Sequence, residues 1–149
     1  LAKLVAEHRL DEDEAAAAEF LGAENVYAGV ARLVAKGGAD GPDTVRFQAA
    51  GGELSLAAVG EFTEGPSHAV LRGEDVVLAR ERPGVSSARN VLDGVVIEVA
   101  REGSLARVTV EVGGLPLVAT VTNGAVAELG LAEGVTVVAS VKATAVHLC

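Results

Sequence analysis

The 149-residue sequence is poor in several residue types, and each shortage excludes a class of protein. Its one cysteine is the last residue, Cys149, so an intrachain disulfide framework and a cysteine-based metal site are both excluded. Aromatic residues make up 3% of the chain, and Met and Trp are absent, so the core must be built from Val, Ala and Leu. Lys and Arg number 12 against 21 Asp and Glu, a net charge of -9 that disfavours nucleic acid and anionic membrane surfaces as partners.

Long apolar runs are also missing. None approaches the roughly 20 residues that cross a bilayer, and the N-terminus lacks the basic-then-apolar order of a signal peptide. We therefore expect a cytoplasmic chain without membrane insertion. Because the sequence begins at Leu1 and has no Met, it is compatible with a piece of a longer polypeptide. What it does contain, 50% hydrophobic residues and 18 glycines, is typical of a globular, turn-rich β protein.

Hydrophobic periodicity divides the chain into a short helical start and a long β region. Residues 1–22 carry apolar residues at helical spacing and predict a short N-terminal helical segment. The second half alternates with period two and predicts four consecutive strands. The alternating sets are Val95, Ile97 and Val99; Val108, Val110 and Val112; Leu117, Ala119 and Val121; and Val135, Val137, Ala139 and Val141.

Turn and cap signals order these strands. Gly113-Gly114 predicts a tight hairpin. Asn123 is expected to cap a short helix that Gly130 ends. Several short strands with one small helix before the last long one are the order of an OB-like barrel.

An internal repeat is visible when the two halves are aligned. Asn25–Val30 corresponds to Asn90–Val95, and a second match relates the end of the first half to the end of the second half. We therefore predict an all-β fold of two OB-like β-barrel units in tandem, residues 23–82 and 86–149, joined at Arg82-Pro83-Gly84. Units this small rarely bury enough apolar surface alone, so we expect them to pack together and the chain to form a homodimer.

Motifs for catalysis are absent. The glycine cluster 37–41 is followed by Pro42-Asp43 and lacks the Lys of a phosphate-binding loop. The three histidines are scattered without ligand spacing, and no serine lies in a nucleophile elbow. We predict no enzyme activity, no bound cofactor and no free metal ion.

A cluster of hydrogen-bond donors is the remaining candidate site. Hydroxyl, amide, cationic and small residues gather at the start and end of the second unit: Ser87, Ala88, Arg89, Asn90, Lys142, Ala143 and Thr144. A lining of donors alone suits a fully deprotonated dianion such as molybdate, tungstate or sulfate, whereas phosphate retains a proton that needs an acceptor. The alternative is that Arg89 and Lys142 are solvated charges in weak surface ion pairs.

The same residues carry a family resemblance. Ser87–Gly94, Leu129–Gly134 and Val141–Val146 resemble the Mop-type molybdate-binding domain, also called the TOBE domain, over residues 86–149. The first half resembles the region that precedes such a unit in ATP-binding subunits of molybdate or tungstate importers. The resemblance implies an OB-like fold that binds a tetrahedral oxyanion between units, with the donor cluster as its site. In the first unit Glu24 replaces Arg89, so we expect that unit to lack a complete site.

Three functions remain open. The leading hypothesis is a regulatory domain of an importer's ATP-binding subunit that senses molybdate or tungstate, with an ATPase domain and, through it, a membrane permease as partners. The second is a molybdate or tungstate storage protein built of two Mop units. The third is a dimerisation module that has lost its ligand.

Overall fold

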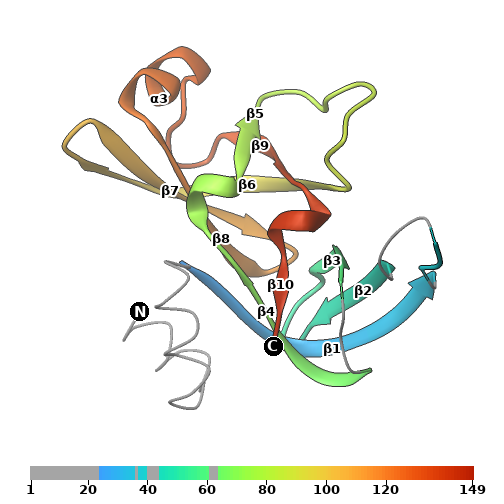
Figure 1. The fold of residues 1–149 in the computed structure, drawn as a ribbon. Coiled ribbons are helices and arrows are strands. Elements are labelled where there is room, and N and C mark those ends of the chain that lie inside the picture. Colours follow the sequence, from blue (N-terminus) through green and yellow to red (C-terminus); the bar gives the residue numbers. More distant parts are fainter. Residues whose placement is uncertain (1–23, 36, 40–43, 61–63) are drawn as a thin grey trace.

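The structure is a computed structural model that describes residues 24–35, 37–39, 44–60 and 64–149. The predicted N-terminal helical segment lies outside these residues. Within them the protein is built of two curled, five-stranded antiparallel sheets, which confirms the predicted all-β class with two OB-like units (Figure 1).

The two halves of the chain repeat the same order of elements. The first half contains β1 (Asn25–Ala35), β2 (Thr44–Ala49), β3 (Ser55–Val59), β4 (Gly65–Leu71), the 3-10 turn η1 (Gly73–Asp75) and β5 (Val77–Ala79). The second half contains β6 (Asn90–Glu102), β7 (Leu105–Val112), β8 (Leu115–Thr122), helix α3 (Asn123–Leu129), β9 (Thr136–Val141), the 3-10 turn η2 (Ala143–Ala145) and β10 (His147–Leu148). In the described residues α3 has no counterpart in the first half.

The sheets exchange their last strands. Their strand orders are β10-β4-β1-β2-β3 and β5-β9-β6-β7-β8, so the short final strand of each half completes the sheet of the other (Figure 1). Val77 lies opposite Ser140, and His147 lies opposite Val70, at matching places of the repeat. The halves are thus related by a pseudo-two-fold arrangement, and neither builds its five-stranded sheet alone. The division into 23–82 and 86–149 remains a prediction about sequence units.

Period-two alternation places one face of β7 in the core. In β7 the buried residues are Ala106, Val108, Val110 and Val112, with exposed or half-buried neighbours between them. In β6 the register shifts between Val96 and Glu98, which makes Ile97 an extra residue. Val96 is therefore fully buried, whereas Ile97 remains 42% exposed.

The turns follow the glycine signals, and the helix cap differs from the prediction. Gly113 and Gly114 have φ of 57° and 85°, the left-handed pair that a two-residue hairpin needs. The N-cap of α3 is Thr122 and not Asn123: its hydroxyl accepts a hydrogen bond from the Ala125 N–H at 3.0 Å. Gly130 ends the helix with φ of 63°, as predicted.

Candidate functional site

The two halves meet at two related places, which we call the first and second interfaces. The first interface is formed by the start of β1 with β8 and η1, and the second by the start of β6 with β3 and η2. A buried asparagine anchors each. Asn25 donates to Val118 O at 2.9 Å and accepts from Val118 N at 2.7 Å. Asn90 donates to Ala57 O at 3.0 Å and accepts from Ala57 N at 2.7 Å.

The asparagine bridges change the role expected of Asn90. Its side chain is 2% exposed, and its oxygen and one amide hydrogen are used by Ala57. Only the second hydrogen of Nδ2 remains for another acceptor. The structure therefore gives Asn90 a clear positioning role, in which it holds β3 against the start of β6.

The first interface carries an additional carboxylate contact. Glu24 Oε2 accepts from Arg107 Nε at 2.7 Å, and Glu24 Oε1 accepts from the Thr120 hydroxyl at 2.7 Å. A Cβ on Gly73 would lie 2.7 Å from Glu24 Oε1, so the backbone of η1 presses against the carboxylate. The chain thus supplies both the cation and the anion of this interface.

The second interface has the corresponding positions but not the corresponding charges. In the second half, Arg107 on β7 lies opposite Thr120 on β8, which is two residues beyond Val118. The matching pair of the first half is Thr44 on β2 and Val59 on β3, which is two residues beyond Ala57. Arg89 stands at the place of Glu24. An arginine therefore replaces the acid, and an uncharged threonine replaces the first interface's arginine.

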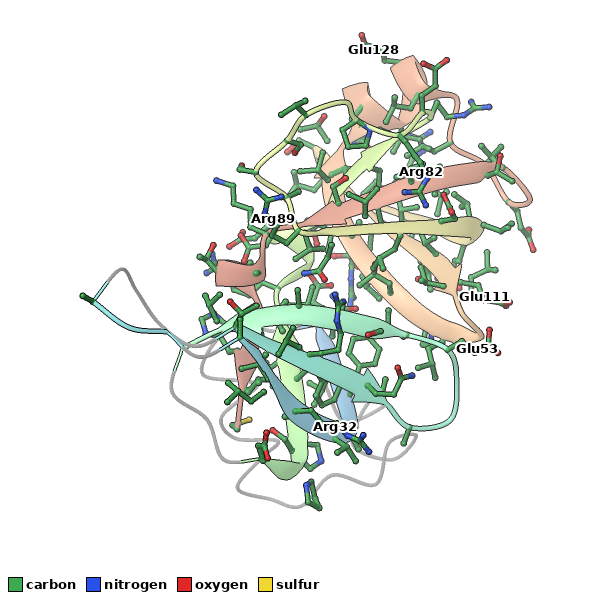
Figure 2. All side chains as sticks on the ribbon, turned by 90° about the vertical axis from the view of Figure 1, so that its right-hand side faces the viewer. Arg32, Glu53, Arg82, Arg89, Glu111 and Glu128 are labelled. Carbon is green, nitrogen blue, oxygen red and sulfur yellow. The ribbon has the colours of Figure 1, made fainter. Side chains whose placement is uncertain are left out.

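Arg89 and Lys142 occupy neighbouring places at this interface. Asn90 lies opposite Val141 in the last pair of the β6–β9 ladder, and Arg89 and Lys142 are the next residues on each strand. Figure 2 shows Arg89 where β6 begins, beside the tip of the β9 arrow. Both side chains are exposed, and among the described residues neither makes an ion pair or a side-chain hydrogen bond.

The residue that corresponds to Lys142 in the first half is Arg72, and it is neutralised. Its Nη2 lies 2.6 Å from Glu74 Oε1, and its Nε lies 3.5 Å from Asp75 Oδ2. In η2 the places of these two acids are taken by Thr144 and Ala145.

The remaining predicted residues differ in their exposure to solvent. Ser87 and Thr144 are exposed, and Ala143 is buried in η2. The Ala88 N–H donates to the Ser86 hydroxyl at 3.1 Å, so a ligand would have to compete for this donor. The accessible donors of the predicted set are therefore the two cations and the two hydroxyls.

An open cavity of about 340 Å³ lies between the 3-10 turns η1 and η2. Its lining includes a histidine that the sequence analysis did not count as a site residue. It is lined by Arg72, Asp75, Lys142, Thr144, Ala145 and His147. His147 matches Val77 in the repeat, and this replacement of an apolar residue by an imidazole was the available signal. Asp75 would repel an anion, so the Arg89 side of Lys142 is the better anion position.

A phenol crosses the first interface as well. The Tyr27 hydroxyl donates to Pro116 O at 2.6 Å, and burial raises the pKa of Tyr27 above its ordinary value. Leu92 occupies the matching place of the second half and can make no such bond. Among the described residues, three side chains of the first half therefore make hydrogen bonds across the first interface, whereas at the second the bonds come from Asn90.

Other kinds of site were sought in the described part of the chain. There, no group of three or more His, Cys, Asp or Glu side chains could hold a metal ion. No helix among these residues has the length and apolar character needed to span a bilayer.

Comparison with known proteins places the chain in one family. A family model described as the TOBE domain matches residues 86–148. A crystal structure of the cytoplasmic molybdate-binding protein ModG with molybdate bound is similar to this chain, with a TM-score of 0.74 and 33% identity, over 85% of this chain and 95% of that one. The chain belongs to the Mop/TOBE domain family. The resemblance seen in the sequence is confirmed, and the TOBE domain is a binding domain.

Two curated relatives of this TOBE protein are importer subunits. They are the molybdate/tungstate import ATP-binding proteins WtpC of Pyrococcus abyssi, 35% identical over 131 residues, and of Pyrococcus horikoshii, 36% identical over 134 residues. Each match covers 88% of this chain and 34% of the relative. The chain thus spans about a third of the length of the curated relatives it matches.

Proposed function

We propose that this TOBE protein binds molybdate or tungstate at the second interface, and that it serves as the oxyanion-sensing region of an importer's ATP-binding subunit. One observation carries the proposal. At the first interface the chain supplies Arg107 and Glu24 to each other, whereas at the second no described acid forms an ion pair with Arg89 or Lys142. An external anion would complete the second interface.

The chemistry of the accessible donors favours a tetrahedral dianion. Arg89 and Lys142 supply charge, and the hydroxyls of Ser87 and Thr144 supply neutral donors around them. The backbone of Ala88 and Ala143 and the second Nδ2 hydrogen of Asn90 complete the proposed set. Hydrogen bonds to charged groups contribute about 1.5 to 3 kcal/mol each, enough for binding against the net charge of -9.

The relatives support the ligand and the setting. ModG is described as binding molybdate, and its structure covers both halves of this chain. The WtpC proteins are described as ATP-binding proteins of molybdate or tungstate import. In this setting the chain is not itself an enzyme, lies in the cytoplasm, and contacts an ATPase domain and through it a membrane permease.

Binding can regulate an importer only if it favours one arrangement of the subunits. The second interface joins β3 of one half to β6 and η2 of the other, so an anion there would hold the halves in one relative position. We also expect a homodimer whose melting temperature rises with added oxyanion, because the ligand binds the folded state. Light scattering at micromolar concentration tests the dimer.

Storage is the second candidate function. The chain matches nearly the whole of ModG, which is described as a molybdate-binding protein and not as part of an importer. This match favours storage. A storage protein would hold many anions per particle, whereas a sensor with one working interface would hold about one per chain.

Isothermal titration calorimetry of the 149-residue chain tests the function. Molybdate and tungstate should bind with about one ion per chain, and phosphate should bind least because its proton finds no acceptor. Absence of heat with molybdate, tungstate and sulfate would instead support a dimerisation module without a ligand.

A further inference from the structure

The first interface has the hydrogen-bond donors of an anion site, although the residue that matches Arg89 in the repeat is Glu24 and not a cation. The Glu24 carboxylate receives one hydrogen bond from a guanidinium and one from a hydroxyl, both at 2.7 Å. These are the donor types that the second interface offers through Arg89, Ser87 and Thr144. At the first interface these donors lie on β7 and β8. An alignment of the start of β1 with the start of β6 therefore does not reveal them.

The carboxylate is held as a ligand would be. Its side chain is 24% exposed, whereas Arg107 is 47% exposed. On its inner side it meets Gly73, where even an added methyl group would lie 2.7 Å from Glu24 Oε1 and 2.8 Å from the Thr120 hydroxyl. The matching residue of the other half is Ala143, which bears that methyl group. The glycine is therefore fitted to the bound carboxylate.

We infer that the first interface is a second small-oxyanion site whose resident anion is the Glu24 carboxylate. Truncation of this side chain opens the site to an external tetrahedral dianion. This inference extends the proposed function to the other interface. In the intact chain Glu24 keeps the first interface closed at every ligand concentration, so that only the second interface responds to the ion.

The space that truncation of Glu24 leaves, and the free donors of Arg107, suit a tetrahedral dianion. Replacement of Glu by Ala removes a methylene and a carboxylate, a group similar in size to a tetrahedral oxyanion. The guanidinium of Arg107 retains its Nη groups, from which no described residue accepts a hydrogen bond. Arg72 lies nearby, one residue beyond the Asn25–Leu71 pair, but Glu74 and Asp75 neutralise it. With one effective cation, the opened site should bind more weakly than the second interface.

Tungstate is the probe, because its anomalous scattering locates each ion directly. Crystals of the 149-residue chain soaked in tungstate should show one ion, beside Arg89 and Lys142. Glu24→Ala should add a second ion between Arg107 and Thr120, and calorimetry should rise from about one to about two ions per chain. Glu24→Gln is the matched control: it removes the charge but leaves the space filled, so the count should stay at one. Glu24→Ala combined with Arg107→Gln should also return to one.

The outcomes separate this inference from the proposed function. Folded Glu24→Ala that binds tungstate at Arg89 but leaves the Arg107 position empty would overturn the inference alone. Tungstate at Arg107 in Glu24→Ala, with none at Arg89 in any variant, would overturn the proposed function and leave the inference standing. If Glu24→Ala does not fold, Glu24→Ser replaces it. Tungstate should then raise the melting temperature of Glu24→Ser more than that of Glu24→Ser/Arg107→Gln, and equal shifts would refute a site at Arg107.

Discussion

The two interfaces share one backbone plan and differ in the side chains that close it. In each, a buried asparagine forms two hydrogen bonds with the backbone of the third strand of the other half. The first interface adds hydrogen bonds of the Tyr27 hydroxyl and the Glu24 carboxylate. Among the described residues, the second adds no further side-chain hydrogen bond between the halves and carries Arg89 in place of the acid. A reversal of charge at one repeated position thus gives the first interface its own ion pair, whereas Arg89 at the second makes no ion pair with any described residue.

Loss of the asparagine bridges is the largest expected effect. Asn90→Ala leaves the N–H and the C=O of buried Ala57 without partners, at about 1 to 3 kcal/mol for each group, so we expect a loss of about 2 to 6 kcal/mol. Asn25→Ala should cost less, because Val118 is only half-buried and water can replace the amide. Urea unfolding measures both. A larger loss for Asn25→Ala would break the comparison of the two bridges.

Removal of the second interface's cations should weaken binding rather than folding. Arg89→Ala and Lys142→Ala should each raise the Kd for molybdate by about 10- to 150-fold, the equivalent of about 1.5 to 3 kcal/mol. Arg72→Ala is the matched control, since its charge is already paired, and it should change the Kd less than about threefold. Calorimetry gives the Kd values, and unchanged melting temperatures show that the variants fold. Wild-type affinity in Arg89→Ala would remove this residue from the site.

Disruption of the first interface's ion pair should cost a moderate amount of stability. Glu24→Gln loses the charge of a partly exposed contact with Arg107 and weakens the bond to Thr120, so we expect a loss of about 1 to 2 kcal/mol. Arg107→Gln should behave similarly, and a double-mutant cycle should give a coupling of about 1 kcal/mol that shrinks in salt. Independent, additive losses would mean that the contact contributes nothing.

The smallest effect should appear at high pH, through Tyr27. Burial raises the pKa of this phenol, so its stabilisation is complete below the unfolded value of about 10 and is lost as pH rises above it. The slope should approach about 1.4 kcal/mol per pH unit, and Tyr27→Phe should lack it. Because Tyr27 is the one tyrosine and Trp is absent, tyrosinate absorbance follows it directly. Titration of the folded protein near pH 10 would contradict the burial of the hydroxyl.

Some features of the fold follow from residues close together in the sequence. The alternation in β7, the Gly113-Gly114 hairpin and the end of α3 at Gly130 depend on local backbone preferences and on one face of a strand meeting the core. The cap of α3 was misplaced by one residue, because Thr122 and Asn123 are both suitable cap types. The sequence grouped Arg89 and Lys142 as donors at the start and end of the second unit, and the β6–β9 ladder places them at adjacent strand ends.

Other features depend on contacts between distant residues. The short strands β5 and β10 carry the same pattern as any edge strand, and only packing of the two halves decides that each joins the other's sheet. Asn90 meets Ala57 across 33 residues, and Glu24 meets Arg107 across 83. The sequence by itself determined the β class and the repeat, because these follow from hydrophobic periodicity and from the similarity of the two halves. Only the tertiary structure decided that Glu24 has a cation of its own, because the partner strand comes from the other half of the chain.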